Sequence, residues 1–164
     1  MIVNKNMNEV DRFLDLNNDI TRILNIFNNC QELKKMLVHT DTRPLEREDI
    51  DKDLRDKQIA RVPLLPYDEE EGSIVVITFI NGEIDPRTNK VIGNIAIDIF
   101  TPGNQWIINE GIRPLQIAHI IDNLMTKDLV QTGGVKYRLS DIVASQLSDI
   151  LLGYRLIYDV VIDD

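Results

Sequence analysis

The stretch Ile95–Met125, IAIDIFTPGNQWIINEGIRPLQIAHIIDNLM, decides the fold, because its hydrophobic periodicity changes from that of a strand to that of a helix. Up to Phe100, apolar and polar residues alternate, which predicts a β-strand with one buried face. From Arg113-Pro114 onward, apolar residues recur at helical spacing, and proline suits a first helical turn. The stretch therefore predicts a strand, a loop that holds Trp106, and an amphipathic helix.

A second strand precedes this stretch and pairs with its first half. Residues 73–80, SIVVITFI, are β-branched and apolar on both faces, which predicts a strand covered on both sides. The segment 81–90, NGEIDPRTNK, is rich in turn dipeptides such as Asn-Gly and Asp-Pro. Because the strand pattern resumes at 91–100, the sequence predicts a long β-hairpin with a polar tip at 81–90.

The N-terminal part of the chain reads as helical. Apolar residues recur at helical spacing from about Asn8 to His39. We expect one or two breaks, one of them at Asn17–Asp19 since Asn and Asp favour helix N-caps, and a further helical piece at Gln31–Val38. Residues 41–72 are dense in charges of both signs and contain prolines, which predicts an exposed connector. A short exposed helix around residues 50–54 fits the pattern there.

The C-terminal part returns to strands. Alternation predicts a short strand at 135–139 and a terminal strand at 152–162 with one apolar face. Residues 140–149 fit either a helix or irregular structure. The element order predicts one α+β domain over 1–164, with a small, mainly antiparallel β-sheet and a long β-hairpin. An N-terminal helix and the middle amphipathic helix flank this sheet.

The domain divides into three parts along the chain. We expect a helical N-terminal segment at 1–40, the charged, proline-containing connector at 41–72, and a hairpin-helix-strand core at 73–164. Hydrophobic residues make up 43% and charged residues 27% of the chain, which is typical of a globular protein. The single cysteine, Cys30, excludes an internal disulfide and a cysteine-based zinc site.

Charge and hydropathy exclude several classes of function. The net charge is −9, and the acidic residues are spread over both halves of the chain. Because proteins bind duplex DNA largely by neutralising its phosphates, this chain is a poor candidate for DNA binding. No apolar run approaches the roughly 20 residues of a membrane span, and the N-terminus lacks the apolar core of a signal peptide.

The usual catalytic motifs do not occur. The sequence contains no phosphate-binding glycine loop, no GxSxG and no HExxH, and we expect no catalytic, cofactor or metal site. Asp98 is the best catalytic candidate, because it is an acid within an apolar strand. A metal-dependent nuclease would need a further acid and a lysine beside it, and no acid-x-Lys element follows Asp98. We therefore expect Asp98 on the solvent or subunit face of its strand.

The residues expected at contacts between subunits lie at breaks in these patterns. Trp106 is the only tryptophan and adjoins a loop, where it would anchor an interface. Arg113 either only begins the helix or pairs with an acid to fix the loop. The full set is Asp85, Arg87, Asn89, Asp98, Trp106 and Arg113.

Several of these elements together resemble a known family. They are Ile97-Asp98-Ile99, Trp106, Arg113-Pro114, Ile121-Asp122 and a Leu- and Tyr-rich terminal strand at 154–161. In this order they resemble the tail terminator, or tail completion, proteins of the bacteriophage neck. The resemblance covers about residues 19–40 and 73–162, and residues 41–72 have no counterpart in it.

The resemblance implies a structural role in the virion and no enzyme activity. Such proteins form rings, commonly hexameric, that end tail-tube polymerisation and offer a docking surface to the head-side connector. The implied partners are further copies of the chain, the tail tube protein and head-side neck proteins. DNA would pass through an acidic lumen without specific binding. The protein would be assembled in the host cytoplasm, would need no cofactor and would contact no membrane.

Other functions stay open at this point. A head-completion stopper or adaptor is another neck component, although adaptors are usually more helical. A small Mg²⁺-dependent nuclease would use Asp98 with Glu83 or Glu110. A host-directed inhibitor could use the acidic surface as a mimic of nucleic acid, and would act as a monomer or dimer.

Overall fold

The computed structural model describes residues 8–62, 69–87, 91–128 and 135–162. Its helices are α1, α2 and α3, and one five-stranded sheet has the strand order β1-β2-β3-β7-β6. The helices are α1 (Asn8–Asn29), α2 (Gln31–Val38) and α3 (Arg113–Asn123), the last continued by a π-helical turn, η4 (Leu124–Asp128). The strands of the sheet are β1 (Ile59–Ala60), β2 (Ile74–Ile84), β3 (Val91–Pro102), β6 (Val135–Gln146) and β7 (Leu151–Ile162). Short elements are η1 (Pro44–Glu46), η2 (Glu69–Glu71), η3 (Gly103–Gln105), β4 (Ile107–Ile108) and β5 (Gly111–Ile112).

Two antiparallel hairpins form the sheet. β2 pairs with β3, β6 pairs with β7, and the antiparallel β3–β7 ladder joins the two hairpins in the middle of the sheet. The parallel pair is β1 with β2, at Ile59↔Val75 and Ala60↔Val76. The prediction of an α+β domain with a mainly antiparallel sheet and a long hairpin is therefore confirmed.

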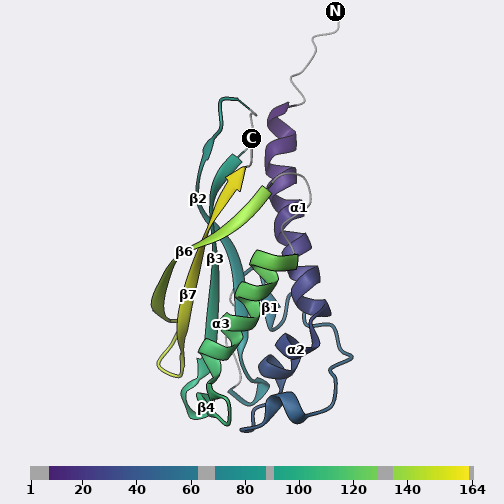
Figure 1. Cartoon of the computed structure of the whole chain (residues 1–164), viewed down its shortest axis with the longest axis vertical. Coiled ribbons are helices and arrows are strands. Elements are labelled where there is room, and N and C mark those ends of the chain that lie inside the picture. The colour runs from purple at the N-terminus through teal and green to yellow at the C-terminus, as the bar shows by residue number, and fades with distance from the viewer. Residues whose placement is uncertain (1–7, 63–68, 88–90, 129–134, 163–164) are drawn as a thin grey trace, which may run out of the picture.

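The helices cover one face of the sheet, as Figure 1 shows. α1 contributes its C-terminal half to the core, and α2 and α3 contribute one apolar face each. The sheet supplies alternate residues of β2, β3 and β7, as the period of two requires. The buried side chains of this main core include Ile23, Phe27, Leu33, Met36, Val75, Ile77, Ile95, Ile97, Ile99, Ile117, Ile121, Leu156 and Tyr158.

A small second cluster lies on the opposite face of the sheet, which we call the outer face. It consists of Ile74, Val76, Phe100 and Leu151, all at most 4% exposed. The residues Ile74 to Ile77 are therefore buried on both faces, as the pattern SIVVITFI predicts, whereas Ile80 at the end of this pattern is 42% exposed.

The break in the N-terminal helical region lies at Cys30, and the prediction of a break at Asn17–Asp19 is wrong. α1 continues without interruption to Asn29, and Cys30 adopts an extended conformation with φ −89° and ψ 107°. The Asn and Asp preference for caps is a local effect of about 1 kcal/mol. Burial of the apolar face of α1 just beyond that point outweighs it.

The hairpin tip is shorter than predicted. The β2–β3 ladder continues to Ile84↔Val91, so that Asn81-Gly82 pairs within the strand and makes no turn. A β-bulge between Phe79 and Asn81 bends β2 at this point. A side chain at Gly93 would place its Cβ 1.9 Å from the Asn81 carbonyl oxygen, so this close approach of the strands requires glycine.

The described part of the connector, 41–62 and 69–72, is mostly exposed but contributes single apolar residues to the core, and the prediction of an exposed helix at 50–54 is wrong. Ile50, Leu54 and Ile59 are at most 8% exposed. Side-chain amides near the α1–α2 junction hold the extended backbone. Gln31 bonds to both the amide and the carbonyl of Ile50, at 2.9 and 3.1 Å, and Asn28 accepts from the Leu54 amide at 2.8 Å. These bonds replace the intrahelical ones, so an extended strap satisfies its polar groups.

The ambiguous segment at 140–149 belongs mostly to a strand. β6 runs continuously from Val135 to Gln146, with a bulge between Leu139 and Asp141. The terminal strand is confirmed as β7. No helix within the described ranges combines the length and the apolar character that crossing a bilayer requires.

We expect alkaline pH to destabilise the protein through Tyr158. Its hydroxyl donates to Asp122 at 2.9 Å, and the ring is fully buried. Burial, followed by the negative charge of Asp122, raises the pKa of Tyr158 above its ordinary value of 10.0. The raised pKa means that the neutral hydroxyl stabilises the folded state. This stabilisation is fully present below the pKa that Tyr158 has in the unfolded chain, and above that pKa it is lost at about 1.4 kcal/mol per pH unit.

Urea unfolding at several pH values above and below the ordinary tyrosine pKa checks this expectation. Tyr158→Phe costs about 1 kcal/mol at neutral pH and should reduce the alkaline slope of stability. A slope remains in the variant, because burial also raises the pKa of Tyr137. Equal slopes for the variant and the wild type would contradict the assignment.

Candidate assembly surfaces

The guanidinium of Arg113 is buried at the end of α2. Its side chain is 1% exposed and donates to four backbone carbonyls. Nε bonds to Gln105 O at 2.9 Å, and one terminal nitrogen bonds to Met36 O and His39 O at 2.9 and 2.7 Å. The other terminal nitrogen bonds to Asp41 O. Burial lowers the pKa of this guanidinium from its ordinary value.

These bonds complete the C-terminus of α2. The last carbonyls of a helix have no partner within the helix, and a positive charge there is favourable. Of the two alternatives left open for Arg113, these bonds favour the one in which it fixes the loop, although its hydrogen-bond partners are carbonyls and not an acid. A side chain that is 1% exposed cannot reach a neighbouring subunit without unfolding this region. Its predicted contact role is therefore corrected to an internal one.

Asp98 lies on the outer face of the sheet and forms a bidentate ion pair with Arg155 of the adjacent strand. Nε of Arg155 bonds to Oδ1 at 2.8 Å, and a terminal nitrogen bonds to Oδ2 at 2.9 Å. The hydrogen bond to Asp98 raises the pKa of the Arg155 guanidinium. The Asp98 side chain is only 6% exposed, whereas that of Arg155 is 40% exposed. Arg155 is thus the part of this pair that another molecule would meet.

The positions of the acids bear on the nuclease alternative. Asp98 is occupied by Arg155, Glu83 lies near the far end of β2, and Glu110 lies in the turn between β4 and β5. These acids therefore lie at different places in the fold, and Asp98 and Glu83 are not in neighbouring register positions. Among the described residues, no three His, Cys, Asp or Glu side chains gather in a way that could hold a metal ion.

Trp106 is half-buried and faces inward. Its indole N–H donates to Thr101 O at 3.1 Å, and its ring lies 6.1 Å from that of Tyr154. The exposed side chain of this loop is its neighbour Ile107, at 72%. Ile107 pairs with Ile112 in the β4–β5 ladder, and Leu115 follows in the first turn of α3. We call Ile107, Ile112 and Leu115 the end patch.

The hairpin tip contains an Asx-type turn. The Arg87 amide donates to Asp85 Oδ1 at 2.9 Å, and the Arg87 side chain is 78% exposed. Asn89 lies outside the described residues. Contacts of Asp85, Arg87 and Asn89 with another subunit stay predictions.

The edge formed by β6 is open and partly apolar. Within the described part of the chain, β6 has β7 as its ladder partner on one side and no strand on the other. Ile142 is 53% exposed and Val143 is 44% exposed. An exposed strand edge with apolar residues is a template for pairing with another chain. We call Ile142, Val143 and Ala144 the β6 edge patch.

The opposite edge of the sheet is open over the distal half of β2. β1 pairs with β2 only at Val75 and Val76, so the backbone of residues 78–84 has no described strand beside it. Ile80 and Ile84 are 42% and 53% exposed there.

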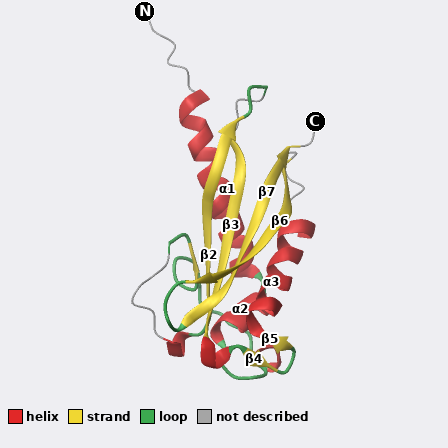
Figure 2. Cartoon of the chain, turned by 90° about the vertical axis from the view of Figure 1, so that its left-hand side faces the viewer, coloured by secondary structure: helices red, strands yellow, loops and turns green. Residues whose placement is uncertain are grey.

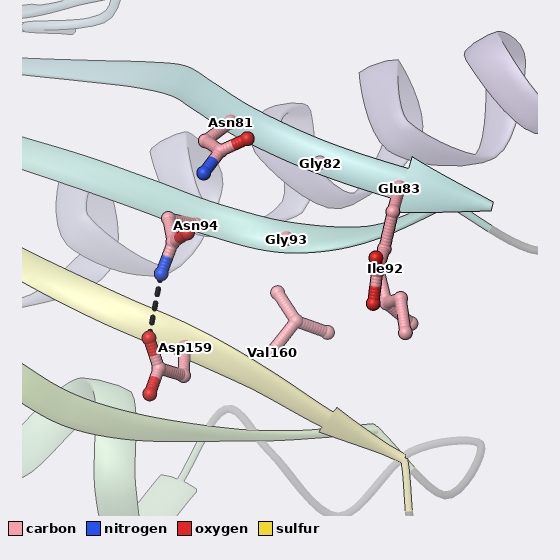
Figure 3. Close-up of a pocket in the computed structure, with 8 residues that line it drawn as sticks. All are labelled: Asn81, Gly82, Glu83, Ile92, Gly93, Asn94, Asp159 and Val160. Carbon is pink, nitrogen blue, oxygen red and sulfur yellow. Dashed lines mark hydrogen bonds between the residues drawn. The ribbon is translucent and has the colours of Figure 1, made fainter. Parts of the chain in front are cut away.

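A pocket lies between the two hairpins near this end of the sheet. Figure 3 shows Asn94 donating to Asp159, a bond of 2.5 Å at the last level where β3 and β7 pair. Beyond this level the two hairpins diverge, as Figure 2 also shows. They leave an open pocket of about 350 Å³, lined by Asn81, Glu83 and Ile92 among others. Arg138 of β6 reaches the same Asp159 at 3.3 Å within its own hairpin, and the Asn94–Asp159 bond ties the two hairpins together.

Sequence reasoning missed two of these features. Arg155 breaks the apolar pattern of the terminal strand, and this signal could have identified it as the partner of a buried acid. The β6 edge patch had a weaker signal, because DIVASQ also fits other structures.

The comparisons with known proteins place this arrangement in a family. The model of the YomW family matches residues 31–160. The matched region begins at α2 and ends in β7, so it includes the connector at 41–72 together with both hairpins. No curated protein and no solved structure gives a significant match.

Proposed function

The chain belongs to the YomW family, and we propose that it is a structural subunit of a phage neck, of the tail terminator type. In this proposal, copies form a ring at the head-proximal end of the tail tube, end its polymerisation and join the tail to the neck. The protein would be part of the virion after assembly in the host cytoplasm. The observation that carries the proposal is a sheet that helices cover on one face and whose described strands leave two open edges, along β6 and along the distal half of β2.

Open edges on opposite sides of one sheet favour contacts that repeat around an axis. A contact between two different surfaces of identical subunits is heterologous, and it closes into a ring when the rotation between subunits allows. The exposed apolar residues of the β6 edge patch supply surface that such a contact would bury. The helical layer would then stay on one side of every subunit in the ring.

A second surface supports contacts along the axis of such a ring. The end patch lies at one end of the molecule, near β4 in Figure 1, and its three side chains are 37 to 72% exposed. We assign to it the contact with the tail tube protein or with the head-side neck protein. The net charge of −9 supports a lumen that DNA crosses without being retained.

Analytical ultracentrifugation and negative-stain electron microscopy test the proposal. The wild type should form rings at high concentration, or caps on one end of isolated tail tubes. The double variant Ile142→Lys/Val143→Lys should stay folded and lose rings and caps, because it places charges on the β6 edge patch.

The control for this variant is Ile150→Lys. Ile150 is 38% exposed in the β6–β7 turn and lies outside the β6 edge patch. This variant should assemble normally. A wild-type protein that stays monomeric and does not bind tail tubes would contradict the proposal. Binding to the head-side connector without binding to tail tubes would indicate a stopper or adaptor.

A further inference from the structure

We propose that neighbouring copies in the ring join by pairing two strand segments into one continuous sheet. The segment Val135–Arg138 of β6 in one copy pairs antiparallel with Asn81–Ile84 of β2 in the next. This inference rests on the proposed function and adds a second part to the ring contact, on the other side of the β6 bulge from the β6 edge patch.

The directions of the strands permit this pairing. β2 and β7 run in one direction, and β3 and β6 run in the other, since each adjacent pair is antiparallel. When two copies stand side by side with their sheets continuous, β6 of one copy is therefore antiparallel to β2 of the next. Exposed backbone N–H and C=O groups on both edges then become partners, as in other cases of strand addition.

The bulges in the two edge strands delimit the segments. β2 is irregular between Phe79 and Asn81, and β6 is irregular between Leu139 and Asp141. Regular strand is therefore available at Asn81–Ile84 on one edge and at Val135–Arg138 on the other. Both segments lie at the end of the sheet where the hairpins diverge (Figure 2).

The ladders within the subunit define a level register. Asn81 is opposite Asn94, Asn94 is opposite Asp159, and Asp159 is opposite Arg138. Asn81 and Arg138 are thus at the same height in the sheet. A ring has its copies at equal height along its axis, so strands that run close to the axis bring Asn81 of one copy to Arg138 of the next.

The same register pairs opposite charges. Two residues further along each strand, Glu83 of one copy faces Lys136 of the next, and both side chains lie on the outer face because residues two apart share a face. Glu83, Lys136 and Arg138 are all exposed. In a chain with net charge −9, this basic end of β6 suits an acidic neighbour. A slip by two residues would place Glu83 opposite Arg138 and preserve the attraction.

These charges and bulges also restrict which strands can pair. Charged side chains and bulges on an edge discourage pairing with unmatched strands. A second copy carries the complementary charge at the matching height, so the features that exclude other partners select this one. Each open edge is therefore occupied by the opposite edge of a neighbouring copy of the protein.

Engineered disulfides test the register directly. In a Cys30→Ser background, Asn81→Cys and Arg138→Cys are combined in one chain. Within a subunit these positions are separated by β3 and β7, or about 14 Å at the usual strand spacing. This is beyond the roughly 7 Å between Cα atoms that a disulfide can span, so every cross-link joins two copies.

The matched pair should give a ladder of covalent oligomers on a non-reducing gel, ending at the band of the closed ring. The off-register control, Asn81→Cys with Gln146→Cys, places its second cysteine at the far end of the same strand, beyond the bulge and outside the β6 edge patch, and should stay largely uncross-linked. In a parallel experiment, Glu83→Lys should raise the concentration needed for assembly about tenfold, and Glu83→Lys with Lys136→Glu should restore it.

The outcomes separate this inference from the proposed function. Rings without cross-linking of the matched pair, or with equal cross-linking of both pairs, would overturn the strand pairing and leave the ring in place. A wild type that stays monomeric, both alone and with tail tubes, would overturn both.

Discussion

Arg113→Met should lower the free energy of unfolding by about 4 kcal/mol, the largest effect that we expect from one side chain. The variant keeps much of the apolar bulk but removes the donors of four hydrogen bonds. The carbonyls of Met36, His39, Asp41 and Gln105 would lose their guanidinium partner, and the bonds to Met36 and Gln105 are buried whereas those to His39 and Asp41 are partly buried. Each such buried acceptor costs about 1–3 kcal/mol when it is left without a partner.

Urea unfolding followed by circular dichroism measures this effect. Arg113→Lys should have an intermediate effect, because a lysine keeps the charge but cannot reproduce the planar fork of donors. Arg43→Met is the matched control. Arg43 lies close by in the sequence, its side chain is 59% exposed, and its ion pair with Glu46 is a surface contact. Its loss should cost less than about 1 kcal/mol. Similar stabilities for the Arg113 and Arg43 variants would refute the role of Arg113.

Gly153→Val should destabilise the protein by about 3 kcal/mol or more and reduce its soluble yield. Gly153 is buried in β7 opposite Phe100 of β3, in the ladder that joins the two hairpins. A Cβ at this position would lie 1.7 Å from the Ile99 carbonyl oxygen. This atom belongs to the backbone, so the β3–β7 ladder itself would have to open.

Gly103→Ala is the control for this substitution. A Cβ at Gly103 would meet nothing within 4 Å, so this change should alter stability by about 0.5 kcal/mol or less. Thermal unfolding of both variants makes the comparison. If Gly153→Val unfolds at the temperature of the wild type, the close approach of β7 to β3 is not required for the fold.

These two positions also guide the assembly experiments. Arg113 and Gly153 act inside the subunit, so their variants should lose rings only because they lose the fold. Ile142, Val143 and Glu83 are exposed, so their variants should lose rings while the subunit stays folded. A stability measurement on each variant therefore separates an effect on assembly from an effect on folding.

The distinction between buried and exposed residues also explains which predictions from the sequence succeeded. The two long strands of the first hairpin, the amphipathic helix after Arg113 and the terminal strand are confirmed. Each has a hydrophobic period that is sustained over most of its length. This period shows which face of an element is buried, and it can be read from the sequence without knowing which other elements pack against that face.

The connector at 41–72 shows where such reasoning failed. Most of its described residues are exposed, as its charges suggested, yet Ile50, Leu54 and Ile59 are buried in the core and do not form the predicted exposed helix. Their spacing follows an irregular extended path and has no single period. The amides of Asn28 and Gln31, far away in the sequence, hold this path in place.

For the candidate surfaces, the sequence alone determined that Asp98 lies on the face of its strand opposite Ile97 and Ile99, since alternation is a local property. It also determined that a helix begins at Arg113. Only the tertiary structure decided that Arg155 neutralises Asp98, that Arg113 completes the end of α2, and that β6 is an edge strand. Each of these depends on which segments the fold brings together, and a one-dimensional pattern records the buried face of a segment but not the neighbour that buries it.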